Sequence, residues 1–266
     1  MAGTSDARLM NFLNSGVGRL VAVNVVSSIV VGITVMSGGP DILPWVTLNA
    51  WPLGVLMRPW TLLTYMFVNA GLLSLLFNML WLYCFGRLAS LCVSSRMLWV
   101  AYVEGGICGG VLLTALSASG LVQRMPLMGS SAAVVSVAVM TAVVMPERRL
   151  NVLIAGSVKL IWVVAVMLLL LFLSFTGDNT GGNIAHLGGA LAGIAAGMCV
   201  RLRMRRARWH HVSADSMETA RPNGLTVQEE ECMDRLLDKA RRSGFNSLSS
   251  EEKQRLFSLS QKIHIP

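Results

Sequence analysis

Six long apolar runs interrupt this sequence, and they leave few folds open to it. A helix that crosses a lipid bilayer needs about 17–25 predominantly apolar residues. Runs that approach this length lie at Leu20–Met36, Leu72–Cys92, Leu98–Ala118, Ser131–Met145, Leu160–Phe175 and Ile184–Leu202. Only 14% of the residues are charged, whereas soluble domains carry about 25%. The sequence therefore predicts an all-α integral membrane protein with six spanning helices, and not a soluble enzyme.

Basic residues predict how these helices are oriented. Lys and Arg are enriched in cytoplasmic loops. If the helices alternate in direction, Arg58 and Arg124 fall on one side and most other basic residues near the helix ends fall on the opposite side. We therefore expect both termini in the cytoplasm. The formal net charge of +8 reflects these basic cytoplasmic segments, and we expect no nucleic-acid partner.

The cysteines predict neither a disulfide nor a metal site. Their number, 5, is odd, and no Cys-x-x-Cys pair occurs. Cysteines within the apolar runs are Cys84, Cys92, Cys108 and Cys199. We interpret these as buried apolar side chains. No metal and no cofactor are expected.

The composition changes after the last apolar run. We expect residues 1–203 to form the membrane domain and the basic and then polar residues 204–225 to form a linker. Two capping boxes and a helix-ending Gly244 predict a small cytoplasmic helical hairpin over residues 226–266. Because so small a hairpin buries little surface, we expect it to dock on the membrane domain or on a protein partner.

His186 is the only histidine within an apolar run. An ionisable side chain inside a span is costly and marks a candidate functional site, although an interhelical hydrogen bond could also satisfy it. Gly189, Gly193 and Gly197 follow at intervals of four and form a smooth ridge for close helix packing. His186 lies on nearly the same face as this ridge. Its imidazole therefore points toward the helix that packs there.

Ser131 begins an apolar run that is too short to cross the bilayer. Residues Ser131–Met145 span about 22 Å as a helix, whereas the hydrocarbon core is about 30 Å thick. Pro146 and the arginines after it fix the cytoplasmic end, so Ser131 lies below the outer surface. Irregular backbone at that depth must be buried or line a wet cavity. Ser131 and its neighbour Ser130 are thus candidate nucleophiles in a polar pocket.

A serine and a histidine at the same depth predict nucleophilic catalysis. Serine is a weak nucleophile until a base takes its proton, and a neutral imidazole can do this. The same imidazole can return the proton to a leaving amine. Free N–H groups at the helix start, the Ser131 N–H above all, can stabilise an oxyanion. The sequence therefore predicts a Ser-His dyad, which needs no carboxylate.

Two motifs in this chain resemble those of the rhomboid family of intramembrane serine proteases. Gly129-Ser130-Ser131-Ala132 is similar to that family's Gly-x-Ser-x motif, and Ala185-His186-Leu187-Gly188-Gly189 to its Ala-His-x-x-Gly motif. The resemblance implies that Ser131 is the nucleophile in preference to Ser130. It also implies that His186 is the general base and acid and that Asn78 helps to bind the oxyanion. Ser74 is a further candidate oxyanion donor.

The resemblance also implies a substrate and a location. Rhomboid proteases cleave single-pass membrane proteins near the outer end of the spanning helix, so such proteins and the lipid bilayer are the expected partners. The bacterial inner membrane is the expected location. The tail after residue 225 is similar to a cytoplasmic appendix of some bacterial members. The gate for the substrate is expected in the fifth apolar run and the loop Gly177–Asn183.

The chain departs from the family pattern at several positions. Asn69 and Ser74 stand where the family commonly has histidines, and Val135 replaces a frequent aromatic residue. A loss of oxyanion donors can cost about 10²–10³ in rate. The departures keep a second hypothesis open, a catalytically impaired rhomboid-like protein that binds membrane helices without cutting them. A transporter is a third, although no inverted repeat or chain of intramembrane acids supports it.

Overall fold

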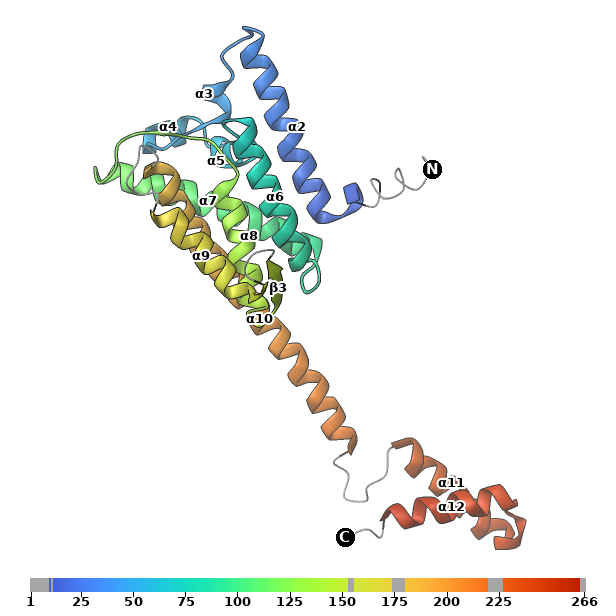
Figure 1. Ribbon diagram of the computed structural model, residues 1–266. Helices are drawn as coiled ribbons and strands as arrows, with labels where there is room; N and C mark the ends of the chain where they lie inside the picture. Colours follow the sequence, from blue (N-terminus) through green and yellow to red (C-terminus); the bar gives the residue numbers. More distant parts are fainter. Residues whose placement is uncertain (1–9, 11, 153–155, 174–179, 220–226, 264–266) are drawn as a thin grey trace. The chain divides into compact units, whose positions relative to one another are not determined.

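The computed structural model describes residues 10, 12–152, 156–173, 180–219 and 227–263 (Figure 1). The chain divides into two compact units, Met1–Arg201 and Leu202–Pro266, and each is considered separately. The first unit is a bundle of helices joined by short loops. The second contains the end of the last bundle helix and a helical hairpin.

Four of the described helices are long and apolar enough to cross a membrane by length and composition. They are α2 (Gly16–Met36), α6 (Leu72–Ala89), α7 (Ser95–Ala118) and the first part of α10 (Thr180–Thr219). Two further apolar helices are shorter, α8 (Ser131–Val144) and α9 (Leu160–Leu173). The predicted helical class is thus confirmed, and four described helices are long and apolar enough to be membrane spans.

The segment between α2 and α6 is folded as a series of short elements. They are α3 (Leu43–Val46), β1 (Leu48–Asn49), α4 (Pro52–Met57), α5 (Thr61–Thr64) and the 3-10 helix η1 (Tyr65–Phe67). Tyr65 donates a hydrogen bond to the Gly106 carbonyl at 2.6 Å, and Tyr102 donates one to the Met66 carbonyl at 2.8 Å. The acceptor Gly106 and the donor Tyr102 are both buried residues of α7. The two hydrogen bonds therefore fix η1 against that helix.

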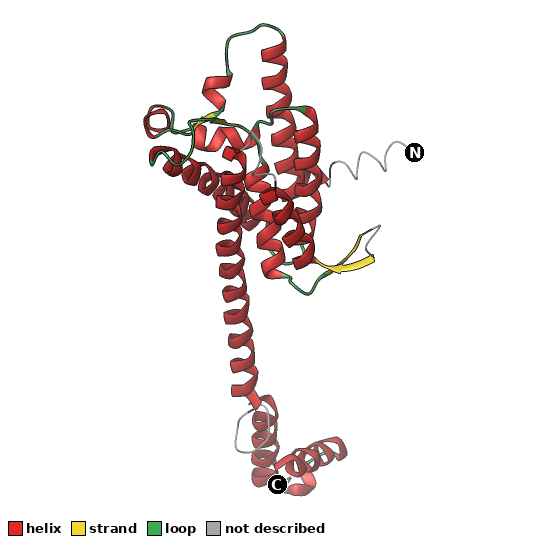
Figure 2. Ribbon diagram, turned by 60° about the vertical axis from the view of Figure 1, so that its left-hand side comes forward, coloured by secondary structure: helices red, strands yellow, loops and turns green. Residues whose placement is uncertain are grey.

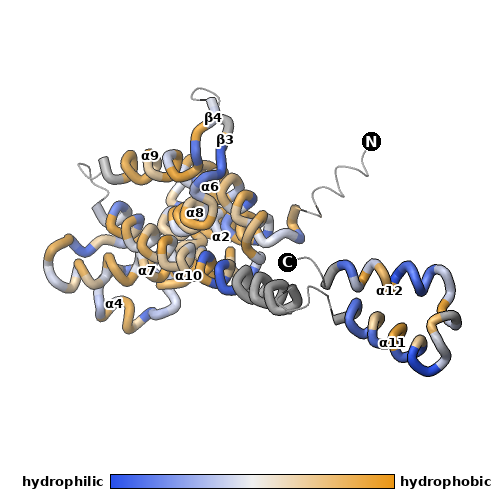
Figure 3. The backbone as a smooth tube through the Cα atoms, turned by 90° about the horizontal axis from the view of Figure 1, so that it is seen from below, coloured by the Kyte–Doolittle hydropathy of each residue, from blue (hydrophilic) through white to orange (hydrophobic). Residues whose placement is uncertain are grey.

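Helix α8 is the central helix of the bundle. In Figure 3, which looks along the bundle, α8 lies between α6, α7 and α10. Every residue from Ala132 to Ala142 is buried. Because a helix that is apolar on all sides must be surrounded by protein or lipid, its composition of Ala, Val and Met fits this central place. α8 ends at Val144 because Pro146 cannot continue it.

A two-stranded hairpin follows α8, where the sequence pattern indicates no strands. β3 (Arg149–Val152) pairs antiparallel with β4 (Gly156–Lys159) and appears in yellow in Figure 2. Gly156 adopts a φ of 67°, a left-handed conformation that favours glycine. Lys159 binds Glu147 at 2.7 Å, and this hydrogen bond holds the pKa of the Glu147 carboxyl below its usual value.

The segment predicted as a linker, residues 204–225, is helical over most of its length. α10 continues without a break to Thr219, through residues 204–219. This stretch contains neither proline nor glycine, and its Arg, Met and Ala residues favour helix. Pro222 and Gly224, which would interrupt a helix, come only later, in residues 220–226, which lie outside the described residues.

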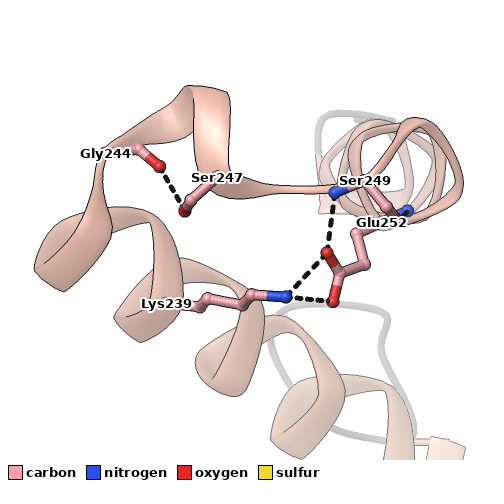
Figure 4. A network of polar contacts seen from close by, with 5 residues as sticks. All are labelled: Lys239, Gly244, Ser247, Ser249 and Glu252. Atoms are coloured by element: carbon pink, nitrogen blue, oxygen red, sulfur yellow. Dashed lines mark hydrogen bonds and ion pairs between the residues drawn. The ribbon is translucent and has the colours of Figure 1, made fainter.

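The second unit contains α11 (Val227–Ser243), the 3-10 helix η3 (Phe245–Ser247) and α12 (Ser250–Ile263). Gly244 ends α11 with a φ of 81°. Ser249 and Glu252 form a reciprocal capping box, with Glu252 Oε2 accepting from the Ser249 N–H at 2.8 Å and Ser249 Oγ accepting from the Glu252 N–H at 3.2 Å (Figure 4). Lys239 on α11 donates to both Glu252 carboxylate oxygens. The buried side chains in the hairpin include Leu236, Leu248 and Leu259.

We expect the hairpin to lose stability in acid through Glu252. The hydrogen bond from Lys239 lowers the pKa of the Glu252 carboxyl, so its contribution is complete above the ordinary glutamate pKa and is lost as the pH falls through the lowered value. Hydrogen-exchange protection factors of α11 and α12 in the full chain should fall several-fold below about pH 4. Glu252→Gln should show reduced protection already at pH 7. The control is Glu251→Gln, and equal losses in both variants would refute a special role for Glu252.

Candidate active site between helices α8 and α10

The start of α8 is held in place by the loop before it. Gly129 has a φ of 139°, which L side chains rarely adopt, and its N–H donates to the Tyr65 carbonyl at 3.1 Å. Ser130 is the N-cap and Ser131 is the first helical residue. α8 has 14 residues and is therefore about 21 Å long. This is shorter than the hydrocarbon core of about 30 Å.

The glycine ridge of α10 lies directly against α8. A Cβ atom added at Gly189 would collide with the Ala132 carbonyl oxygen. One at Gly193 would lie 2.5 Å from the Ser136 carbonyl oxygen. Further along, a Cβ at Gly197 would lie 2.7 Å from Val143 Cβ. The two backbones can approach this closely only because these positions carry no side chain.

A second pair of glycines brings α7 against the same part of α10. A Cβ at Gly188 would lie 2.7 Å from the Gly109 Cα, and one at Gly109 would lie 2.7 Å from the Ala185 carbonyl oxygen. The first turns of α10 are therefore fixed against both α7 and α8. His186 lies between Ala185 and Gly188, so the packing of both neighbours fixes the position of its backbone.

This packing places His186 beside Ser131. The distance between His186 Nε2 and Ser131 Oγ is 2.8 Å, which is a hydrogen bond. His186 is buried with 8% of its surface exposed, whereas Ser131 is half-buried. Acceptance of the serine proton by Nε2 requires the ring hydrogen to be on Nδ1, and Nδ1 has no hydrogen-bond partner among the described residues. The histidine thus contacts the serine through one nitrogen only.

Ser130, the competing nucleophile, faces a different partner. Its side chain is fully buried, and its hydroxyl donates to Asn69 Oδ1 at 3.0 Å. The Ser130 backbone N–H reaches the same oxygen at 3.4 Å. Of the two adjacent serines, Ser131 is the one with a hydrogen bond to His186.

Asn78 on α6 reaches the same group of polar side chains. Its Nδ2 donates to Asn69 Oδ1 at 2.7 Å and makes a longer contact of 3.4 Å with Ser74 Oγ. Asn69 is therefore the acceptor that connects Asn78 with Ser130. The sequence pattern identifies Asn69 only as a departure from the family. The available signal for its role is its position, since it is a polar residue between two apolar segments.

The expected gate loop falls partly outside the described residues. Residues 177–179 of the expected gate loop Gly177–Asn183 are not described, and the rest of it forms the first turn of α10. Val135, which replaces the family's aromatic residue, is buried in the core. Across the described ranges, no group of three or more His, Cys, Asp or Glu side chains is arranged to hold a metal ion.

The hydrogen-bonded pair Ser131 and His186 thus lies in a bundle of apolar helices, and four of the described helices are long and apolar enough to cross a membrane. A family profile for the Rhomboid domain matches residues 56–203, which is more than half of the chain. The protein belongs to the rhomboid family, a family of intramembrane proteases, and the predicted family membership is confirmed. Helix α2 precedes the matched segment.

The hairpin unit matches a different profile. Residues 223–262 match DUF6576, a family of unknown function. No curated protein matches the chain. The Rhomboid match therefore identifies the family of the membrane unit, whereas the match of the hairpin assigns it no activity.

Proposed function

We propose that this protein is an intramembrane serine endopeptidase that hydrolyses a peptide bond in the spanning segment of single-pass membrane proteins. The observation that carries the proposal is the 2.8 Å hydrogen bond between Ser131 Oγ and His186 Nε2. In the proposal Ser131 is the nucleophile and His186 is the general base and then the general acid. The rhomboid family match supports the reaction class.

In the proposed reaction His186 Nε2 takes the proton of Ser131 while Oγ attacks the substrate carbonyl carbon. The carbonyl oxygen becomes an oxyanion, and the Ser131 N–H at the start of α8 and the Asn78 amide stabilise it. His186 then gives the proton to the leaving amine, and the C–N bond breaks. Water attacks the acyl-enzyme by the same sequence of proton transfers and releases Ser131.

The proposed topology has six spans, with α8 and α9 as the two short members alongside α2, α6, α7 and α10. Both termini are proposed to be cytoplasmic, because most basic residues near the helix ends lie on one side in that arrangement. The bacterial inner membrane is the proposed location. In this proposed topology Ser131, at the start of the short α8, lies below the outer surface, where the outer end of a substrate helix would reach it. Gly189, Gly193 and Gly197 are proposed to hold His186 at that depth.

A second function is supported by the contacts of Asn78. Both of its amide hydrogens are directed at neighbours, Asn69 and Ser74, and Ser74 occupies a position where the family commonly has a histidine. These features favour a helix-binding rhomboid protein with impaired catalysis. Such a protein would bind single-pass membrane helices and release them uncut.

Labelling with a fluorophosphonate probe separates the two functions. We expect the detergent-purified wild type and Ser130→Ala to react, because a serine activated by a base attacks phosphorus readily. Ser131→Ala and His186→Ala should lose the label. A folded wild type, judged by a cooperative melt, that does not react would contradict the protease proposal and favour the helix-binding function.

A further inference from the structure

One side chain, Asn69, connects three separate parts of the membrane unit. It lies between η1 and α6 and is buried, with 8% of its surface exposed. Its Oδ1 accepts hydrogen bonds from Asn78 Nδ2 at 2.7 Å and from Ser130 Oγ at 3.0 Å. Asn78 is a proposed oxyanion donor, and Ser130 immediately precedes the proposed nucleophile. Asn69 Oδ1 thus connects the proposed oxyanion donor on α6 with the residue that precedes the proposed nucleophile on α8.

The backbone N–H and the side-chain Nδ2 of Asn69 are hydrogen-bonded to α2. Its backbone N–H donates to Ser28 Oγ at 3.1 Å, and its Nδ2 donates to the same oxygen at 3.3 Å. Ser28 lies outside the segment 56–203 that matches the Rhomboid profile. The Asn69 side chain is therefore fixed at both its donor end and its acceptor end, and the anchor for the donor end comes from the first span.

The chemistry of an amide explains why asparagine suits this position. A carbonyl oxygen has two lone pairs and accepts from Asn78 and Ser130 together, whereas an imidazole nitrogen has one lone pair and accepts from one of them. The amide also keeps a donor for Ser28. A histidine at residue 69, the family's usual choice, could satisfy only part of this network.

We propose that Asn69 is a positioning residue for the oxyanion site. It fixes the direction of the Asn78 amide and restrains Ser130 next to Ser131, and Ser28 on α2 holds it in place. One Asn78 hydrogen is committed to Asn69 at 2.7 Å. The other, in the long 3.4 Å contact with Ser74, is the hydrogen that turns to the oxyanion. This inference rests on the proposed protease function.

The test is the kinetics of fluorophosphonate labelling on the full chain, resolved into the inactivation rate kinact and the affinity KI. The phosphoryl oxygen takes the place of the oxyanion in the transition state, so a misdirected Asn78 slows kinact and leaves KI unchanged. We expect Asn69→Leu to lower kinact by about 10²-fold, the size of effect seen when an oxyanion donor is lost. Asn69→His and Ser28→Ala should lower it by about tenfold, because each keeps part of the network.

The matched control is Thr141→Val. Thr141 is buried on α8, and its hydroxyl donates to the Val137 carbonyl at 2.6 Å, about ten residues or 15 Å from Ser131. It should lower the melting temperature about as much as Asn69→Leu does, with kinact unchanged. The pH dependence of kinact should be the same in all variants, because His186 keeps its contact with Ser131.

Each remaining outcome is decisive. If wild type labels and Asn69→Leu labels at the same kinact, the positioning role is overturned while the protease proposal stands. If kinact falls equally in Thr141→Val, the effect is one of stability and the role is again overturned. If wild type fails to label, both proposals fall together. Should Asn69→Leu not melt cooperatively, Asn69→His and Ser28→Ala decide by the same criterion.

Discussion

Ser131→Ala, His186→Ala and the double variant should all cleave a model spanning substrate at the same residual rate. We expect each to lower kcat by about 10⁴–10⁶-fold, because residues that act as a unit lose their effect together. The 2.8 Å hydrogen bond between the two side chains is the physical reason. The measurement is turnover in proteoliposomes of a single-pass helix whose outer end is rich in glycine and small residues.

Binding provides the control for this experiment. Ser131→Ala should still bind the spanning substrate with the affinity of wild type, because the variant removes only one oxygen from a half-buried position. A double variant slower than either single variant by a further large factor would contradict a coupled dyad. It would mean that each residue acts separately.

Gly189→Ala should disable the site without touching either proposed catalytic side chain. The added Cβ would meet the Ala132 carbonyl oxygen, a backbone atom of α8 that cannot move aside alone. The helices must separate, and a displacement of about 1 Å can cost about 10²-fold in rate. We expect fluorophosphonate labelling to fall by at least that factor and the melting temperature to fall as well.

Alanine substitutions of two other glycines are the controls for Gly189→Ala. Gly32→Ala on α2 adds a Cβ that meets nothing within 4 Å, so labelling and melting should match wild type. Gly197→Ala lies on the same ridge, but the added atom meets the side chain of Val143, far from Ser131, and should reduce stability more than labelling. Labelling of Gly189→Ala at the wild-type rate would mean that the ridge does not set the position of His186.

Much of the membrane unit follows from local sequence rules. The apolar runs place α2, α6 and α7 to within a few residues, and Pro146 correctly marks the end of α8. The repeated glycines predict a close helix approach on the face that carries His186. These features are readable because spacing along one helix fixes which residues share a face. Family membership, predicted from two short motifs, is confirmed.

Other features depend on contacts that sequence spacing does not encode. The Asn69 network joins Ser28, Asn78 and Ser130, which come from α2, α6 and the loop before α8, and no local pattern relates them. The β3–β4 hairpin and the continuation of α10 to Thr219 were not predicted either. In the stretch of α10 up to Thr219 the many charges suggest a linker, although a segment without Pro or Gly continues a helix readily. The assignment of Ser131, His186 and Asn78 to catalysis stays a prediction.

Nδ1 of His186 has no hydrogen-bond partner among the described residues, and this bears on the route of the proton in the proposed reaction. In a relay, a second acceptor behind the imidazole would let protons pass through the ring. Here Nδ1 is buried without a partner in the described part of the chain, so we predict that in the proposed reaction the proton that His186 takes from Ser131 leaves again through Nε2. A proton inventory of the acylation step in mixed H₂O and D₂O should accordingly be linear, with a single hydrogen in flight.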